Sequence, residues 1–273
     1  MPRPGLPKLI ATDLDGTLVR SDNTVSAYTH QVLDRVRAAG IPVVGATGRG
    51  PRLTELTRND IRAADFLVMA GGGWVVDQTD PIGPVVLRDE RLRSEVLTEL
   101  LATLEAEVGP LIVMVEAADG HEAPLWGDFD PSWPYPDRFE ARSRTECLST
   151  DVIKAFARTT DHDVDVLLAT ARRIISPKVA SLTQAGLGYI EISPPGVDKG
   201  TGLDVVTQAL GVDPAEVLVF GDMPNDLPMF EWAGWGRVAV ANAHPTVRAL
   251  ADEVTLRNDD DGVAIFLDQL LSR

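Results

Sequence analysis

The sequence predicts an α/β fold, in which a Rossmann-like, doubly wound parallel sheet carries an inserted α+β domain. Two observations point to it. Short continuous apolar runs, typical of parallel strands buried on both faces, alternate with helical patterns in the first and last parts of the chain. From about Gln78 to about Ile190 the pattern changes, and strand-like and helix-like pieces follow each other as in a separate α+β unit.

Composition limits the class of protein. The chain has 273 residues, of which 44% are apolar, enough for one large domain or two modest ones. Lys and Arg total 25 against 41 Asp and Glu, and a net charge of −16 repels a phosphate backbone, so we expect no nucleic-acid partner. The single cysteine, Cys147, excludes an internal disulfide. The sequence does not indicate the oligomeric state.

No apolar run approaches the roughly 20 residues of a membrane span. The proline-rich first residues lack the longer apolar segment of a signal peptide. We therefore expect a cytoplasmic protein with no membrane partner.

The first predicted strand, Leu9–Thr12, ends at two acids, Asp13 and Asp15. Open α/β sheets bind ligands just beyond the carboxyl ends of such strands, so both acids are candidate site residues. Taken alone, Asp13–Thr17 also suits an ordinary turn, because Asp, Gly and Thr are common in turns. A helix is predicted from Ser26 to Ala39, with Gly40 as its stop.

The second predicted strand, Ile41–Thr47, ends in a hydroxyl, and Gly48 to Arg52 open the next helix. Thr47 and the backbone N–H groups after it are candidate anion donors, although Thr47 judged alone is equally an ordinary helix cap. A third strand, Phe66–Ala70, is followed by Gly71–Trp74.

In the middle of the chain, Leu92–Val108 and Asp163–Ile174 are the clearer helices, and Leu111–Val115 and Val179–Thr183 are strand-like. The segment Trp126–Phe139 holds five aromatics and three prolines, which exclude a regular helix or a central strand. It is either a loop that covers the substrate or a surface loop that aromatics such as Trp133 and Tyr135 hold in place.

The chain returns through Leu187–Ile192 to a helix predicted from Gly202 to Leu210. Lys199 lies near the start of this helix, where the helix dipole disfavours a cation. We therefore expect Lys199 to bind an anion; the alternative is a solvated surface lysine. The strand Val217–Asp222 again stops at an acid. Further on come the strand Val238–Val240, a helix opened near His244, which we take as structural, and an acidic run at Asp259–Asp261 that alone suggests a solvated loop.

Strands of one parallel sheet that end at Asp13, Asp15, Thr47 and Asp222, with Lys199 nearby, would gather carboxylates and a cation in one crevice. A hard divalent ion relieves the repulsion among such carboxylates, and Mg²⁺ binds a few carboxylate oxygens together with substrate phosphate. None of the four histidines has metal-ligand spacing, and neither a Gly-x-Ser-x-Gly elbow nor a Walker-type loop is present.

Four motifs together resemble one family, the haloacid dehalogenase-like hydrolases, and within it the Cof-type phosphatases. The motifs are Asp13-Leu14-Asp15-Gly16-Thr17, Thr47-Gly48-Arg49, Lys199-Gly200 and Gly221-Asp222-Met223-Pro224-Asn225-Asp226. The resemblance covers the whole chain and implies a catalytic core at residues 1–78 and 191–273 and an inserted cap domain at 79–190. Gly71 stands where the family usually has asparagine.

The resemblance implies that Asp13, Asp222 and the backbone carbonyl of Asp15 bind Mg²⁺. Asp13 would form an aspartyl-phosphate, and Asp15 would protonate the leaving group and then activate water. The implied substrate-binding residues are Thr47, Gly48, Lys199 and Asn225, with Asp226 in support.

The predicted function is Mg²⁺-dependent hydrolysis of small phosphorylated metabolites, with sugar phosphates as the expected class. A phosphomutase or phosphotransferase that uses the same aspartyl-phosphate is an alternative, since the choice depends on how well the cap excludes water. A catalytically idle metabolite-binding protein is a weaker one, because Asp13 and Asp15 are both present.

Overall fold

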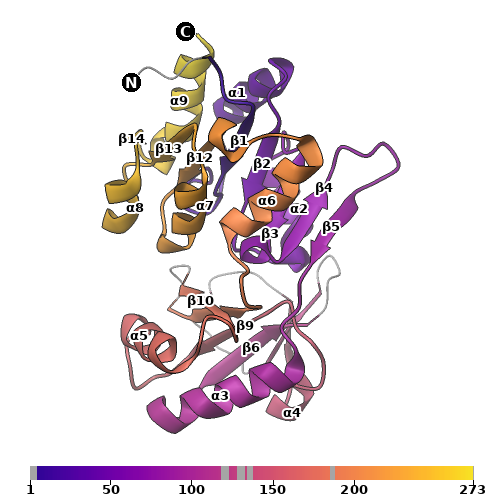
Figure 1. The fold of residues 1–273 in the computed structure, drawn as a ribbon, viewed down its shortest axis with the longest axis vertical. Helices are drawn as coiled ribbons and strands as arrows, with labels where there is room; N and C mark the ends of the chain where they lie inside the picture. The colour runs from indigo at the N-terminus through magenta and orange to yellow at the C-terminus, as the bar shows by residue number, and fades with distance from the viewer. Residues whose placement is uncertain (1–4, 118–122, 128–132, 134–137, 185–187, 273) are drawn as a thin grey trace. The chain divides into compact units, whose positions relative to one another are not determined.

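The computed structural model describes residues 5–117, 123–127, 133, 138–184 and 188–272. The described chain divides into two compact units (Figure 1). Unit 1 comprises residues 1–48, 55–88 and 198–273, and unit 2 comprises residues 49–54 and 89–197. Because the second unit is inserted in the first, the chain has the predicted layout of a core with an inserted domain.

Unit 1 is built on an eight-stranded sheet. Its spatial order is β14 (Glu253–Val254), β13 (Gly236–Ala239), β12 (Val217–Gly221), β1 (Leu9–Thr12), β2 (Val43–Ala46), β3 (Phe66–Met69), β4 (Trp74–Asp77) and β5 (Val85–Asp89). Neighbouring strands from β14 to β3 are parallel, and β4 is antiparallel to β3. The strand order reverses between β1 and β12, which is the switch point where open α/β sheets bind ligands.

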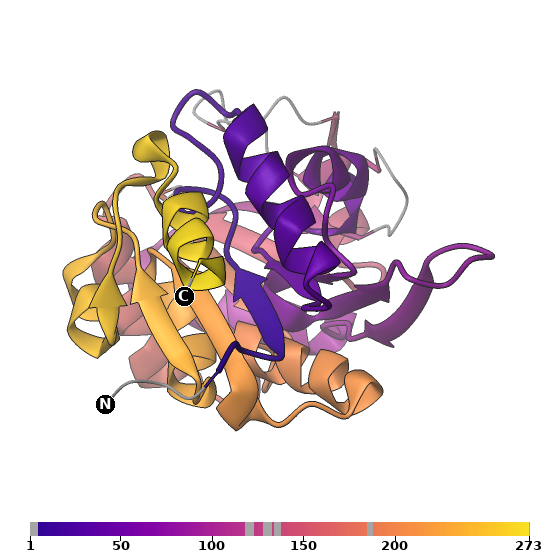
Figure 2. The same cartoon turned by 90° about the horizontal axis from the view of Figure 1, so that it is seen from above.

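Helices lie on both faces of this sheet (Figure 2). On one face α1 contacts α9, and on the other α6 contacts α7, which contacts α8. Their bounds are α1 Ala27–Ala38, α2 Thr54–Asp60, α6 Lys199–Leu210, α7 Leu227–Trp232, α8 Pro245–Leu250 and α9 Gly262–Leu271. The α/β fold and the doubly wound parallel core are thus confirmed.

The strands form where the sequence predicts buried runs. Every residue of β1, β2, β3 and β12 is buried, as expected for strands covered by helices on both faces. The helix α1 begins after Ser26, whose hydroxyl accepts the N–H of Thr29, and it ends at Ala38, with Ala39 as its C-cap before Gly40.

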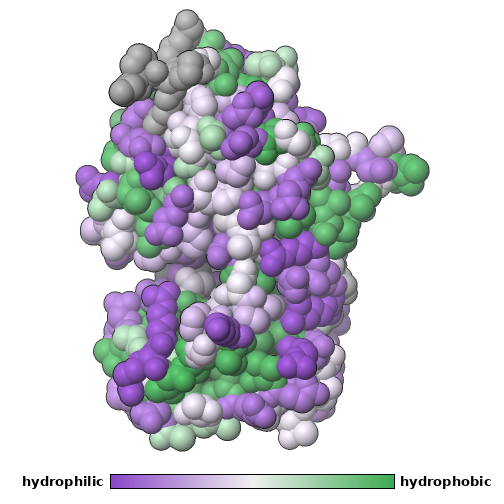
Figure 3. Space-filling view, viewed as in Figure 1, coloured by the Kyte–Doolittle hydropathy of each residue, from purple (hydrophilic) through white to green (hydrophobic). Residues whose placement is uncertain are grey.

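The arm between β4 and β5 projects from unit 1 and carries exposed apolar side chains (Figure 3). Ile82 is 97% exposed, and Val85 and Val86 are also exposed. β5 ends the strand order of the sheet, so among the described residues its outer edge pairs with no further strand.

Unit 2 is an α+β domain on a six-stranded sheet. Its order is β10 (Ser181–Gln184), β11 (Ile190–Ser193), β9 (Lys154–Arg158), β6 (Ile112–Glu116), β7 (Leu125–Gly127) and β8 (Phe139–Ala141). The pairs are antiparallel except β7 with β8. The helices are α3 (Ser94–Val108), α4 (Arg144–Cys147) and α5 (Val164–Ile174).

The two faces of the unit 2 sheet differ. One face packs alternate residues such as Val113, Ala155 and Ile192 against leucines of α3 and α5. The other face carries a small aromatic cluster of Phe156 and Tyr189, against which Trp133 packs. Period-two alternation therefore places the apolar core on one side and a mixed set of side chains on the other.

Some local predictions need correction. The segment Trp126–Phe139 was expected to exclude a central strand, yet Trp126 lies in β7, between β6 and β8, and Phe139 begins β8. Strand pairing reaches both ends of the segment because its prolines lie between them, and Tyr135 lies outside the described residues. The helix predicted from Gly202 begins at Lys199, since Asp198 caps it.

The domain limits at residues 79 and 190 remain predictions, and the compact units change over at 89 and 197. Across the part of the chain that the structure describes, each helix is too short or too polar to traverse a bilayer.

Candidate active site

Three neighbouring strands of unit 1 deliver predicted site residues to the same edge of the sheet. Asp13 directly follows β1, Thr47 directly follows β2 and Asp222 directly follows β12. Since these strands are parallel and adjacent, with β1 in the middle, their carboxyl ends meet at one edge. All three residues are buried, with Asp13 at 5% and Asp222 at 6% exposure.

Lys199 lies between two of the carboxylates. Its Nζ donates to Oδ1 of Asp13 at 2.5 Å and to Oδ1 of Asp226 at 2.6 Å, and its side chain is only 1% exposed. The alternative of a solvated lysine is therefore wrong. A buried ammonium at a helix N-terminus needs such partners, because neither water nor the helix dipole stabilises it there.

Asp226 is fixed by hydrogen bonds on both oxygens. Oδ1 accepts from Lys199, and Oδ2 accepts the backbone N–H groups of Asp222 and Met223 at 2.8 and 2.9 Å. With both oxygens engaged, Asp226 holds the lysine and the turn after β12 in place.

Burial and the neighbouring charges shift the pKa values of the cluster. Burial raises the pKa of Asp13 well above its ordinary value, and although Lys199 lowers it, Asp226 and Asp222 raise it further. Burial, together with Asp226, raises the pKa of Asp222 to about 7, against a lowering by the Thr17 hydroxyl. Burial alone would lower the pKa of Lys199, but the two carboxylates outweigh it and raise that pKa.

The loop after β1 is shaped by a glycine. Gly16 has φ +86°, a left-handed conformation that a side chain disfavours, and a Cβ there would lie 2.5 Å from Oδ2 of Asp222. The next residue, Thr17, donates its hydroxyl to Oδ1 of Asp222 at 2.9 Å. Gly16 thus lets the loop that carries Asp15 approach Asp222, and Thr17 fastens it there.

Two glycines let the helix carrying Lys199 come close to the loop after β3. A Cβ on Gly72 would collide with the carbonyl of Asp198, and one on Gly202 would lie 2.8 Å from the Cα of Gly72. Gly71, where the family usually has asparagine, has φ +63° and donates its N–H to the carbonyl of Thr47 at 3.0 Å. This contact is made by the backbone and therefore does not need asparagine.

The remaining predicted site residues fall in the same unit. Thr47 is not the N-cap of the next helical turn, because that turn begins at Pro51 and has Gly50 as its N-cap. Gly48 follows Thr47 at the same sheet edge. Asn225 lies in the 3₁₀ turn Pro224–Asp226, and within the described residues its Oδ1 is buried without a hydrogen-bond partner.

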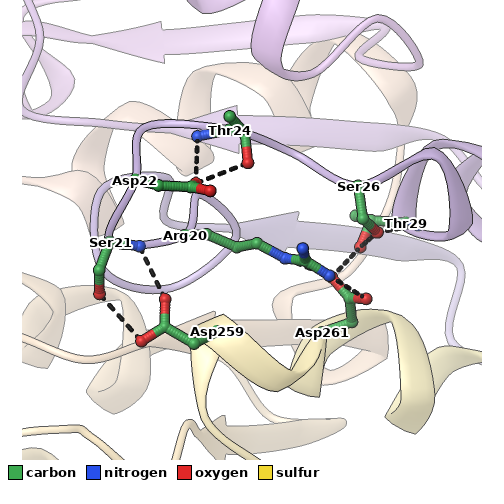
Figure 4. A network of polar contacts seen from close by, with 8 residues as sticks. All are labelled: Arg20, Ser21, Asp22, Thr24, Ser26, Thr29, Asp259 and Asp261. Atoms are coloured by element: carbon green, nitrogen blue, oxygen red, sulfur yellow. Dashed lines mark hydrogen bonds and ion pairs between the residues drawn. The ribbon is translucent and has the colours of Figure 1, made fainter.

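Polar contacts that the sequence pattern did not reveal hold the segment after Thr17 (Figure 4). Arg20 pairs with Asp261, with its Nη2 2.6 Å from Oδ2, and Ser21 donates its N–H and hydroxyl to Asp259. Thr29 also donates to Asp261. The acidic run is thus not a freely solvated loop, since two of its acids bind the segment that follows the first motif.

Unit 2 buries charges of its own, which the sequence analysis did not single out. Lys154 donates to Glu191 at 2.7 Å, and both are nearly inaccessible. Glu116 is fully buried and accepts the backbone N–H of Arg52 at 3.2 Å. A lysine in an apolar strand is the one sequence feature that could have indicated the first pair.

A divalent cation fits the acidic cluster. Carboxylate oxygens of Asp13, Asp222 and Asp226 all lie within 4.8 Å of one another. Burial raises the pKa values of Asp13 and Asp222, and the neighbouring carboxylates raise them further, so a cation bound there would stabilise both carboxylates in their charged form. Oxygen-only donors of this kind suit a hard ion such as Mg²⁺.

Comparison with known proteins agrees with this arrangement. The family model described as haloacid dehalogenase-like hydrolase matches residues 10–267. A 5-amino-6-(5-phospho-D-ribitylamino)uracil phosphatase of Bacillus subtilis is 29% identical over 97% of this chain and 98% of its own. A phosphoglycolate phosphatase of Archaeoglobus fulgidus is 30% identical, covering 94% of each chain.

Solved structures share the fold. A haloacid dehalogenase-like hydrolase from Bacteroides thetaiotaomicron superposes with a TM-score of 0.74 at 26% identity, over 97% of this chain and 99% of its own. The predicted resemblance is therefore confirmed over nearly the whole length. The chain belongs to the haloacid dehalogenase-like hydrolases and is a phosphatase of that family.

Proposed function

We propose that this phosphatase hydrolyses small phosphorylated metabolites, sugar phosphates in particular, in a Mg²⁺-dependent reaction that passes through a phosphorylated Asp13. The observation that carries the proposal is the buried contact of Lys199 with Asp13 at the switch point of the sheet. A carboxylate in this place meets any ligand bound beyond the strand ends, and a fixed cation lies beside it.

Asp13 is the proposed nucleophile. A phosphate monoester dianion repels an attacking carboxylate, so the transferring phosphoryl group needs positive charge beside it. Lys199 supplies such a charge, in a position that Asp226 fixes. Thr47, Gly48 and Asn225 are proposed to bind the phosphoryl oxygens. The Oδ1 of Asn225 is buried without a hydrogen-bond partner among the described residues, which supports a polar role for that side chain.

Asp15 is the proposed general acid and base. It stands two residues beyond the nucleophile on a loop that Gly16 and Thr17 hold against Asp222. From there it would protonate the leaving alkoxide and then take a proton from the water that hydrolyses the aspartyl-phosphate. The proton that it gives in the first step is thus regained in the second.

Mg²⁺ is proposed to bind Asp13, Asp222 and the backbone carbonyl of Asp15. Asp226 is assigned a supporting role because both its oxygens are already engaged. When bound, the ion would neutralise charge on the transferring phosphoryl group. The deprotonated Asp222 carboxylate that it requires is oriented by the Thr17 hydroxyl.

The named relatives support the substrate class. One acts on a phosphate carried by a ribityl chain, and the other on phosphoglycolate, so both names describe small phosphate monoesters. The net charge of −16 supports a free metabolite rather than a nucleic acid as the ligand. The cytoplasmic location expected from the sequence remains a prediction.

The experiment is phosphate release from a panel of sugar, polyol and carboxylic-acid phosphates, with Mg²⁺ and with EDTA. Asp13→Asn should lower turnover by on the order of 10⁴-fold or more, with an unchanged fold by circular dichroism, because the amide keeps the shape and removes the nucleophile. Full turnover in that variant would contradict the covalent route. Transfer of the phosphoryl group to an added sugar, with little phosphate released, would overturn hydrolysis.

A further inference from the structure

Two asparagines outside the four motifs hold the loop that carries Asp15. The Nδ2 of Asn242 donates to the carbonyl of Gly16 at 2.8 Å, and the Nδ2 of Asn258 donates to the carbonyl of Val19 at 3.0 Å. The two are joined, because the backbone N–H of Asn258 donates to Oδ1 of Asn242 at 3.0 Å. We propose that Asn242 and Asn258 are positioning residues that set the placement of Asp15 for proton transfer.

The backbone of the loop closes on itself around Asp15. The carbonyl of Leu14 accepts the N–H groups of Thr17, Leu18 and Val19, which closes a tight turn around Asp15 and Gly16. These bonds define the shape of the turn but do not attach it to the sheet. The Thr17 hydroxyl attaches the turn to Asp222, and the carbonyls of Gly16 and Val19 attach it to the two asparagines.

Gly16 is held from two sides. On one side Asp222 lies so close that a Cβ would be 2.5 Å from its carboxylate, and on the other the amide of Asn242 binds the Gly16 carbonyl. Since Gly16 directly follows Asp15 and has left-handed φ, a small rotation there would swing the Asp15 carboxyl. Fixing the Gly16 peptide therefore fixes Asp15.

The asparagines are themselves held rigidly. The N–H of Ala241 donates to Leu256, and the N–H of His244 donates to the backbone carbonyl of Asp222 at 2.7 Å, so the loop after β13 is bound on both sides of Asn242. Asn258 is 4% exposed, which protects its hydrogen bonds from water. A preorganised amide of this kind can set a catalytic group without touching the substrate.

The inference depends on the proposed role of Asp15 as general acid, and leaving-group dependence tests it. An alkyl phosphate needs protonation of its leaving oxygen, whereas para-nitrophenyl phosphate has a stable leaving group and needs it little. Asn242→Asp keeps the size of the side chain and the acceptor for Asn258 but sets an oxygen against the Gly16 carbonyl. We expect kcat/KM for alkyl phosphates to fall by about 10- to 100-fold, and for the aryl phosphate by less than about threefold.

Asp259→Asn is the matched control, because it weakens a nearby contact to Ser21 at an exposed site. It should leave the ratio of alkyl to aryl kcat/KM unchanged. Asn258→Ala should change the ratio in the same direction as Asn242→Asp. Equal losses on both substrates, or none, would overturn the inference, and a lower melting temperature alone would not rescue it. Failure of the unaltered protein to cleave either substrate would instead overturn the proposed function.

Discussion

At the scale of single residues, the site depends on one buried lysine. Lys199 stands where a helix dipole repels it and water cannot reach it, and it is retained by Asp13 and Asp226. The arrangement makes the lysine a fixed charge rather than a mobile one. An environment preorganised in this way stabilises a transition state because no reorientation is needed when charge develops.

Replacing Lys199 should therefore harm both rate and stability. Lys199→Ala is expected to lower kcat/KM for every substrate by about 10²- to 10³-fold. It should also lower the free energy of unfolding by about 3–5 kcal/mol, because it leaves the buried carboxylates of Asp13 and Asp226 without their cation. Initial rates on several substrates and denaturant titrations measure the two effects.

The double variant Lys199→Met with Asp226→Asn separates these effects. It removes one cation and one anion together, so much of the stability should return while the rate stays low. A loss of rate confined to a single substrate would place Lys199 in substrate selection instead.

At the scale of elements, the aromatic segment Trp126–Phe139 has two distinct ends. Trp126, in β7, packs with the helix-covered core, and Arg142 lies over its ring at 4.5 Å. Trp133 packs edge-on against Phe156 at 5.0 Å and against Tyr189 at 5.5 Å. Of the two interpretations of this segment, packing is the one that the contacts of Trp133 favour.

Trp133→Ala should accordingly act through stability. Each edge-to-face pair contributes about 0.5–1.5 kcal/mol, so the variant should lose roughly 1–3 kcal/mol. Its effects on kcat/KM for para-nitrophenyl phosphate and for a sugar phosphate should be equal. Trp126→Ala is the matched control on the other face of the sheet. A changed ranking of substrates for Trp133→Ala alone would show that this ring contacts the substrate.

At the scale of the whole molecule, stability and metal binding are linked through pH. The pKa of Asp222 rises from its ordinary value of 3.8 to about 7 on folding. Between these values the folded state holds a proton that the unfolded state releases, so this group makes stability fall as pH rises through that window. Mg²⁺ binds the deprotonated form and should reverse the loss.

We therefore expect Mg²⁺ to raise the melting temperature more at about pH 8 than at about pH 6. Asp222→Asn should diminish the shift at both values and flatten the dependence of the metal-free melting temperature on pH. Thermal unfolding with Mg²⁺ or EDTA measures this without any substrate. If Mg²⁺ raised the melting temperature of the variant as much as that of the unaltered protein, Asp222 would not be a metal ligand.

The sequence predicts the parallel core well, because each buried strand is a local apolar run. An acid at the end of such a strand is visible in the sequence, because it interrupts the apolar run. The site residues Asp13, Thr47 and Asp222 meet for that reason. The contacts of Asn242, Asn258 and the acidic run could not be predicted in this way. Each of these contacts joins segments more than 200 residues apart or two irregular loops. Such contacts leave no periodic pattern in the sequence from which the pairing could be predicted.

The burial of Glu116 against the segment Arg49–Thr54 limits how a chimera between this protein and a relative could be made. Unit 2 includes that segment as well as residues 89–197, so it is not formed by one continuous stretch of the chain. Gly50 leaves no room for a Cβ beside the Glu116 carboxylate, and Arg52 pairs with it. A chimera spliced at 89 and 197 alone would bring a foreign residue opposite Gly50 and Arg52. Replacing unit 2 with that of a relative therefore requires both pieces to be exchanged together.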